Sequence, residues 1–347
     1  MNHFYSPQPS ETISVVVESS PVWEVILGIA GYTHAQLRHT FDQHEQWTAA
    51  RGSMPSSFVS QLQEVEQNNL WYGLIMVQNK LSAYSVRDFS HRLNNLSADG
   101  LYETLLPYKD RDSEPIRKAI ASQSDRKESI EKYAALFEGH DYLSGYVRCL
   151  ARYSPPKICE LFHQIVTEWH DWVSRQKDWE KWTQALAFEQ KLHSSLDQNR
   201  PIEEIERITG GVKYLPEPSI WEIKLVPHVS YRPWTLAKRT ADTKLFFYPL
   251  REDYWLEPGV PSTELVRGHK ALGDELRLKL LYQLQKGPLS LQELSVMFQI
   301  SKTTLHHQLS LLKAAKFIHV EKGIYSANLA QIHSFSDRLA HYLGDIQ

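Results

Sequence analysis

The sequence has only two cysteines in 347 residues, Cys149 and Cys159, and it has no long apolar run. Two thiols ten residues apart on helical sequence are more often core residues than a disulfide, so we expect no disulfide. No apolar stretch approaches the roughly 18 residues that span a bilayer, which predicts a protein without a membrane segment or a membrane partner. The first residues lack a basic stretch followed by an apolar core, and we therefore expect a cytoplasmic protein.

Enzyme motifs are lacking as well. The sequence has no Gly-rich phosphate loop, no Gly-x-Ser-x-Gly elbow and no nucleophilic Cys with a matching His, which predicts that the chain is not an enzyme and needs no cofactor. Glu160 and His163 form a single Glu-x-x-His pair, whereas a di-metal site in a helix bundle needs two such pairs. His333 and His341 lack the further ligands expected beside them, so no metal site is predicted.

Positive charge is scarce overall and unevenly divided. The chain has a formal net charge of −3, yet residues 262–347 contain ten Lys or Arg against seven Asp or Glu. This C-terminal part therefore carries +3, and residues 1–261 carry −6. An excess of three is too small to establish nucleic-acid binding by itself, so that case depends on a motif.

Residues 265–314 show the pattern of a helix-turn-helix. One helix is expected over 265–286, where leucines recur every four residues and Gly287 with Pro288 ends the helix. Ser290 and Glu293 form a capping box for a second helix, which ends near residue 298. Ser301 is a suitable N-cap for a third helix, whose apolar face repeats at Leu305, Leu309 and Leu312. The polar residues of its other face are typical of a helix that enters the major groove: Lys302, Thr303, His306, His307, Ser310 and Lys313.

A β-hairpin is predicted directly after the third helix. The runs Phe317–Val320 and Ile324–Asn328 flank a short turn in which Gly323 supplies the turn conformation. Many helical domains also contain a short turn between two helices. The added hairpin, or wing, favours a winged helix-turn-helix that binds DNA.

The stretches ALGDELRLKLL, LSLQELS and ISKTTLHHQLSLLKAAKFI resemble the arsenical-resistance-repressor (ArsR) family of winged-helix regulators, over roughly residues 267–328. The resemblance implies a homodimer that represses transcription by binding an inverted repeat in double-stranded DNA. The DNA-binding positions that we expect are Lys302, Thr303, Thr304, His306, His307 and Ser310 in the third helix and Lys322 in the wing. Gln308 and Lys316 depart from the family, which usually has His and Gly there. The Cys-x-Cys pair of the family's thiolate metal sensors is also absent, because residues 293–297 contain no cysteine.

The expected fold class is mainly α (α+β), with a mostly helical domain at 1–257 and the winged helix at 262–347. A strand at Ile13–Ser19 should join two extended runs after Ser219, IWEIKLVPHV and TKLFFYPL, in a small sheet. Helices are expected from about Pro21 and near Ser57, Ser85, Ser97, Arg126 and Asp141, and from Pro155 to about Leu196 with a possible break. In this long helix Trp169, Trp172, Trp179 and Trp182 would share one face. Residues 251–264 are predicted to connect the two domains.

Three functions are open for the N-terminal domain. It could be a sensor and dimerisation domain, in which a small organic effector enters an aromatic-lined pocket and shifts the two winged helices of a dimer. It could be an architectural or protein-interaction domain without an effector, or an enzyme domain fused to a DNA-binding domain. We expect the first: a dimeric repressor controlled by an unknown effector.

Overall fold

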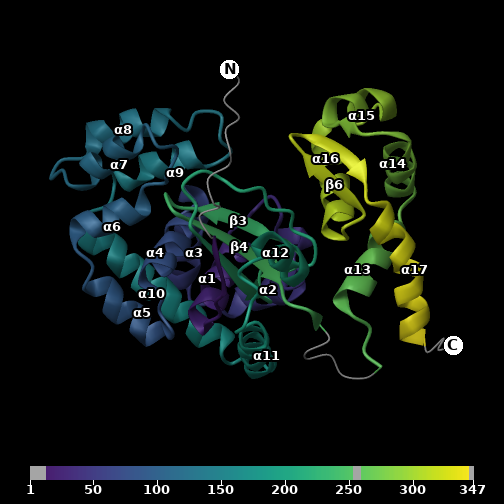
Figure 1. Cartoon of the computed structure of the whole chain (residues 1–347), viewed down its shortest axis with the longest axis horizontal. Coiled ribbons are helices and arrows are strands. Elements are labelled where there is room, and N and C mark those ends of the chain that lie inside the picture. Colours follow the sequence, from purple (N-terminus) through teal and green to yellow (C-terminus); the bar gives the residue numbers. More distant parts are fainter. Residues whose placement is uncertain (1–12, 253–258, 344–347) are drawn as a thin grey trace, which may run out of the picture. The chain divides into compact units, whose positions relative to one another are not determined.

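The computed structural model describes residues 13–252 and 259–343, in two compact units (Figure 1). The first, here called the N-terminal unit, comprises Met1–Ala35 and Glu45–Leu250. The second, the winged-helix unit, comprises Gln36–His44 and Arg251–Gln347. The membership of Gln36–His44 in the second unit was not predicted. Part of the predicted connection, residues 253–258, and the first twelve residues lie outside the described residues.

The N-terminal unit is mainly helical. Its helices are α1 (Pro21–Tyr32), α2 (His44–Ala50), α3 (Ser56–Asn68), α4 (Trp71–Leu81), α5 (Val86–Asn94), α6 (Ala98–Leu105), α7 (Glu114–Ala121), α8 (Lys127–Ala135), α9 (Leu143–Leu150), α10 (Pro155–Val173), α11 (Trp179–Leu192) and α12 (Pro201–Thr209), with a short 3-10 turn at Arg51–Ser53. A second 3-10 turn, Arg38–Thr40, belongs to the winged-helix unit. Ser85 and Ser97 cap α5 and α6, each by accepting a hydrogen bond from a backbone N–H in the first turn, as predicted.

The predicted long helix is broken into α10 and α11, between residues 173 and 179. Trp169 on α10 and Trp182 on α11 are buried, whereas Trp172 and Trp179 beside the break are only partly buried. Trp169 packs edge-on against Tyr32 of α1, with 5.5 Å between ring centroids. The four tryptophans therefore do not form one continuous face, because the break interrupts the helical period that the spacing assumed.

A four-stranded sheet lies among these helices (Figure 1). The strands β1 (Ser14–Val17), β2 (Glu222–His228), β3 (Leu236–Arg239) and β4 (Thr243–Pro249) are arranged in the order β1-β2-β4-β3. β1, β2 and β4 are parallel, which confirms that the first strand joins the two later runs, and β3 pairs antiparallel with β4. β3 was missed because its sequence is largely polar.

Alternation along the strands gives the sheet two different faces. Ile223 and Leu225 of β2 lie on one face and pack in a core with Ile205 and Ile208 of α12. On β4, Phe247 packs instead against Trp23 of α1, with 5.2 Å between ring centroids. Glu24, next to Trp23, is fully buried and accepts backbone hydrogen bonds from Val229 and Ser230 just beyond β2, which holds α1 to the end of that strand.

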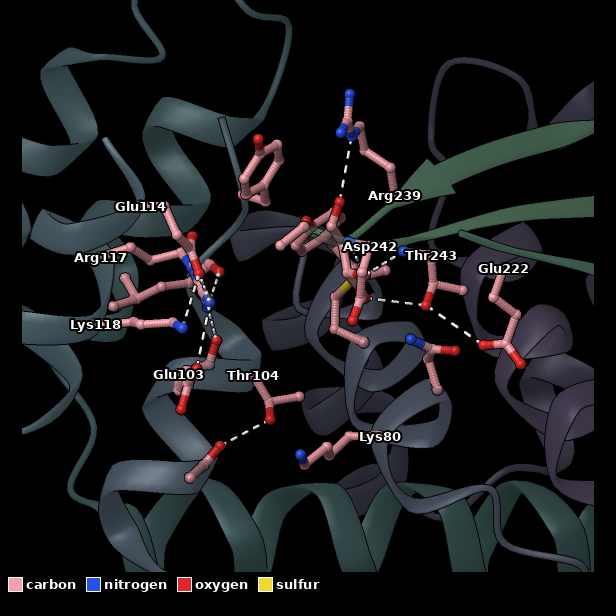
Figure 2. A pocket seen from close by; sticks show the side chains of 18 of the residues that line it. Lys80, Glu103, Thr104, Glu114, Arg117, Lys118, Glu222, Arg239, Asp242 and Thr243 are labelled. Carbon is pink, nitrogen blue, oxygen red and sulfur yellow. Dashed lines mark hydrogen bonds and ion pairs between the residues drawn. The ribbon is translucent and has the colours of Figure 1, made fainter. Parts of the chain in front are cut away.

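A cavity of about 370 Å³ lies between the helices α4, α6 and α7 and the start of β2 and the β3–β4 turn (Figure 2). One wall carries Glu114, Arg117 and Lys118 of α7, and the opposite wall carries Asp242 and Thr243 of the turn. The cavity is therefore lined largely by charged and polar side chains. It differs from the aromatic-lined pocket expected for a small organic effector.

The winged-helix unit has the elements of the predicted motif. They are α13 (Thr263–Leu272), α14 (Glu275–Lys286), β5 (Leu289–Ser290), α15 (Leu291–Phe298), α16 (Lys302–Ala314), β6 (Ile318–Glu321), β7 (Ile324–Ala327) and α17 (Leu329–Leu343). The single helix predicted over 265–286 is in fact two. Gly273 ends α13, and Asp274 caps α14 by accepting a hydrogen bond from the backbone N–H of Arg277.

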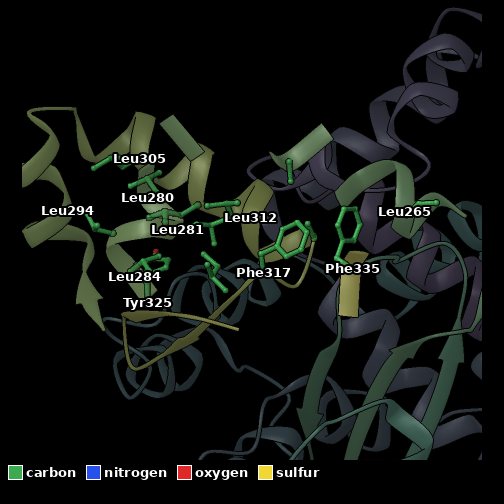
Figure 3. Close-up of a cluster of buried hydrophobic side chains, with 14 residues drawn as sticks. Leu265, Leu280, Leu281, Leu284, Leu294, Leu305, Leu312, Phe317, Tyr325 and Phe335 are labelled. Atoms are coloured by element: carbon green, nitrogen blue, oxygen red, sulfur yellow. The ribbon is translucent and has the colours of Figure 1, made fainter. Parts of the chain in front are cut away.

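One apolar core joins the elements of this unit (Figure 3). Its buried members come from α14, α15 and α16 and from the wing, and include Leu280, Leu294, Leu305 and Phe317. Phe335 of α17 extends this core towards α13, where it lies against Gly268. A β-carbon built on Gly268 would lie 2.2 Å from the Phe335 ring, so only glycine permits this close approach of α13 and α17.

We expect Gly268→Ala to destabilise the winged-helix unit by about 1–3 kcal/mol, because the added methyl forces α13 and α17 apart. Gly287→Ala is the matched control, since a β-carbon there meets nothing within 4 Å. Hydrogen–deuterium exchange over 263–343, followed by mass spectrometry of the full chain, measures the effect. Equal protection in the two variants would contradict the packing described.

Candidate DNA-binding surface

Arg277 on α14 ties α16 to the end of α13. Its guanidinium donates to the backbone carbonyls of Ala271 and Lys270 at the end of α13, at 2.6 and 2.8 Å. It also donates to the side-chain oxygen of Gln308 on α16, at 2.8 Å. Gln308, one of the two departures from the family pattern, therefore has a structural partner in this chain. Sequence periodicity gave no sign of this role of Arg277.

The turn between α15 and α16 is set by local hydrogen bonds. Ser290 and Glu293 form the predicted capping box at the start of α15, and Gln299 ends that helix with a left-handed backbone, at φ 55°. Ser295 then donates from its hydroxyl to the carbonyl of Ile300 at 2.7 Å, a contact that the sequence analysis did not foresee. Ser301 caps α16 by accepting from the N–H of Thr304 at 3.2 Å, as predicted.

Burial along α16 follows the predicted helical period. Leu305, Leu309 and Leu312 are at most 1% exposed and lie in the core of the unit. The positions expected to meet DNA at the start of the helix are all exposed: Lys302, Thr303, Thr304, His306 and His307. Ser310 differs from this expectation, because it is only 6% exposed and its hydroxyl donates to the carbonyl of His307 at 2.7 Å. Its hydroxyl is satisfied within the helix, so the prediction that Ser310 faces away from the core is wrong.

One of the exposed positions has a ring partner inside the winged-helix unit. The imidazoles of His39 and His307 lie with 4.3 Å between their centroids and an interplanar angle of 30°. Burial, followed by the effect of His307 and His44, lowers the pKa of His39, which favours the neutral ring in this stack. A base contact by His307 would require this ring pair to separate.

The wing follows α16 after three residues, 315–317. β6 and β7 pair antiparallel with Glu321 opposite Ile324, and β5 adds a third strand through Leu289 and Tyr325. Lys322 and Gly323 form the two-residue turn with φ of 51° and 80°, which is the positive-φ geometry favoured in tight hairpins. Lys322 is exposed at the tip, where the sequence predicted it.

Lys316, the other departure from the family, joins α16 to the wing in a left-handed conformation with φ 61°. Glycine adopts this region at no steric cost, so the structure explains why glycine is usual here. The Lys316 ammonium lies 3.7 Å from the carboxylate of Glu264 on α13, and Arg338 donates to the same carboxylate at 2.7 Å. Burial raises the pKa of Glu264, but these two cations outweigh it and lower the pKa to about 2, so the carboxylate stays ionised.

Within residues 13–252 and 259–343, no three His, Cys, Asp or Glu side chains come together in a group that could hold a metal ion. In the same part of the chain, no helix is both long enough and apolar enough to cross a membrane.

The comparisons with known proteins identify the C-terminal motif. Residues 274–320 match the model of the bacterial regulatory protein, arsR family, which covers α14 to β6. No curated protein and no solved structure matches the chain. The chain thus carries an ArsR-type winged helix-turn-helix, the kind of domain with which transcription regulators bind DNA.

We predict that Lys316→Gly leaves the winged-helix unit more stable than Lys316→Ala, by about 1 kcal/mol. Both variants lose the contact with Glu264, so their difference isolates the cost of a β-carbon at positive φ. At Lys313, inside α16, the order should reverse, because alanine is the better helix former. Urea unfolding of the full chain tests both pairs, and alanine equal to glycine at 316 would refute the backbone argument.

Proposed function

We propose that the protein is a dimeric transcriptional repressor that binds an inverted repeat in double-stranded DNA and responds to a small effector. The observation that carries the proposal is the exposed polar start of α16, held outward by a buried leucine face, next to a wing with an exposed lysine at its tip. The match to the arsR family supports the same class of partner.

The residues of this surface suit different parts of DNA. The ammonium groups of Lys302 and Lys322 are suited to phosphates, which attract any cation and carry no sequence information. Thr303 and His307 have hydrogen-bonding side chains suited to base edges in the major groove, which His307 reaches once its ring separates from that of His39. Thr304 and His306 are exposed beside them and complete the proposed DNA-contacting set.

The dimer in this proposal is inferred from the geometry of B-DNA. One recognition helix reads only a few base pairs, and a second copy bound about 34 Å away reads the next turn of the same groove. Doubling the contacts in this way supplies specificity that one helix cannot reach. The N-terminal unit, with its own core and cavity, is then available for dimerisation and for sensing.

Selection of bound fragments from a genomic DNA library, followed by footprinting, tests this function. The full-length protein is used at controlled salt, because affinities for DNA depend steeply on ionic strength. Enrichment of an inverted repeat upstream of a small set of genes, with transcription of those genes reduced by the protein, is the expected result. Binding without sequence preference would instead indicate the architectural role.

We predict that Lys302→Ala weakens binding about equally on all sequences and flattens its salt dependence. Each lost phosphate contact lowers the slope of log affinity against log salt by about 0.9, so a dimer should lose about two. Lys279→Ala is the matched control, because Lys279 is an exposed lysine on α14 that pairs with Glu275. An unchanged slope for Lys302→Ala, or an equal loss in both variants, would exclude a phosphate contact at Lys302.

A further inference from the structure

Residues at helical spacing on three separate helices line the cavity of the N-terminal unit. On α4, Asn79 and Lys80 follow Tyr72 and Met76 by one or two turns, so all four line the same side. Residues three and four apart do the same on α6, at Gly100, Glu103 and Thr104, and on α7, at Glu114, Arg117 and Lys118. On β2, Glu222 and Lys224 share a face because they are two residues apart.

Several charges of this cavity are already neutralised. Arg117 donates to both carboxylate oxygens of Glu114, at 2.7 and 2.8 Å. Lys224 lies 3.2 Å from Glu18, and Arg239 lies 2.9 Å from Glu217. These paired side chains form part of the cavity walls and offer a ligand little unpaired charge.

Other polar groups of the cavity have no partner of opposite charge. Among the described residues, the exposed Lys80 at the cavity has no hydrogen-bond or ion-pair partner for its ammonium. Within residues 13–252 and 259–343, the carboxylate of Asp242 accepts only from the hydroxyls of Thr240 and Thr243, at 2.8 and 3.1 Å. In the same residues, the carboxylate of Glu222 accepts only from the Thr243 hydroxyl, at 3.4 Å. Figure 2 shows Lys80 apart from Asp242 and Glu222, with no interaction drawn between them.

Asn79 supplies an independent sign that a hydrogen-bond donor is missing. Its side-chain oxygen is buried and accepts no hydrogen bond within the described part of the chain. A buried acceptor without a donor costs free energy, and such a group at the edge of a cavity is commonly satisfied by a bound molecule or water. Asn79, Glu222 and Asp242 together thus offer acceptors, whereas Lys80 offers a cation.

We propose that this cavity binds a small zwitterionic metabolite, an α-amino acid or a close analogue, and that this ligand is the effector. Its ammonium group is held by the acceptors of Glu222, Asp242 and Asn79, and its acid group by Lys80. The volume of about 370 Å³ is near the lower end for ligand pockets, and the polar lining disfavours an apolar ligand. The claim that this ligand is the effector, the regulatory half of the inference, rests on the proposed function. The claim that the cavity binds it does not.

The test uses the full-length protein without DNA and the twenty standard L-amino acids as probes. Thermal shift followed by calorimetry should find at least one that binds. Lys80→Gln and Glu222→Gln should each weaken that binding by about tenfold or more, because each removes a charged hydrogen bond. In the part of the chain that the structure describes, Lys80 has no partner and the Glu222 carboxylate has one long hydrogen bond, so neither change should unfold the chain.

The matched control is Glu128→Gln, which removes a carboxylate outside the cavity, where it pairs with Lys132 on α8. N-acetyl and ester derivatives of the binding amino acid should bind poorly, since each lacks one of the two charges. Binding of none of the amino acids, binding that survives both cavity substitutions, or binding of neutral sugars or divalent cations instead would overturn the assignment.

A second step separates this inference from the proposed function. The amino acid that binds is added to the protein on its selected DNA, and the DNA affinity should change in the wild type but not in Glu222→Gln. Ligand binding without a change in DNA affinity would overturn the regulatory half alone. Ligand binding by a protein that never binds DNA would contradict the proposed function and leave the assignment of the cavity standing.

Discussion

The burial of three leucines on one side of α16 is the constraint on which the DNA-binding surface depends. Leu305, Leu309 and Leu312 are at most 1% exposed, and burying each contributes about 1.5–3 kcal/mol. Rotating the helix by one residue would expose this face and bury charged or polar groups in its place. The outward direction of Lys302, Thr303 and His307 is therefore a consequence of core packing, and DNA is not needed to produce it.

Polar contacts then fix the position of the helix along its axis. Ser301 caps its first turn, Arg277 ties Gln308 to the end of α13, and Ser295 holds the preceding turn through Ile300. At its other end the chain passes through left-handed backbone at Lys316 into the wing. A surface held in this way before binding loses little further conformational freedom on DNA, which favours affinity.

The elements of this unit that the sequence predicted correctly are those with short-range signals. The capping box at Ser290 and the leucine period of α16 are short-range patterns, and both gave the right elements. The break at Gly273 and Asp274 is set by a local glycine and a local helix cap, which the continuous leucine period concealed. The strand β3 and the contact of Arg277 with Gln308 depend instead on polar residues without a period and on a partner distant in sequence. Ser310 was misplaced because a short hydroxyl can bond to its own helix and be buried. The polar cavity joins residues from 72 to 243, which no local pattern relates.

The central claim is that the exposed start of α16 reads the base sequence of DNA. Selection of DNA fragments by the wild type and by a Thr303→Ala, His307→Ala double variant, compared at the same salt, tests it most directly. The account predicts that the variant still binds DNA through its lysines but loses or changes its sequence preference. An unchanged preference would show that α16 does not read the bases at these positions.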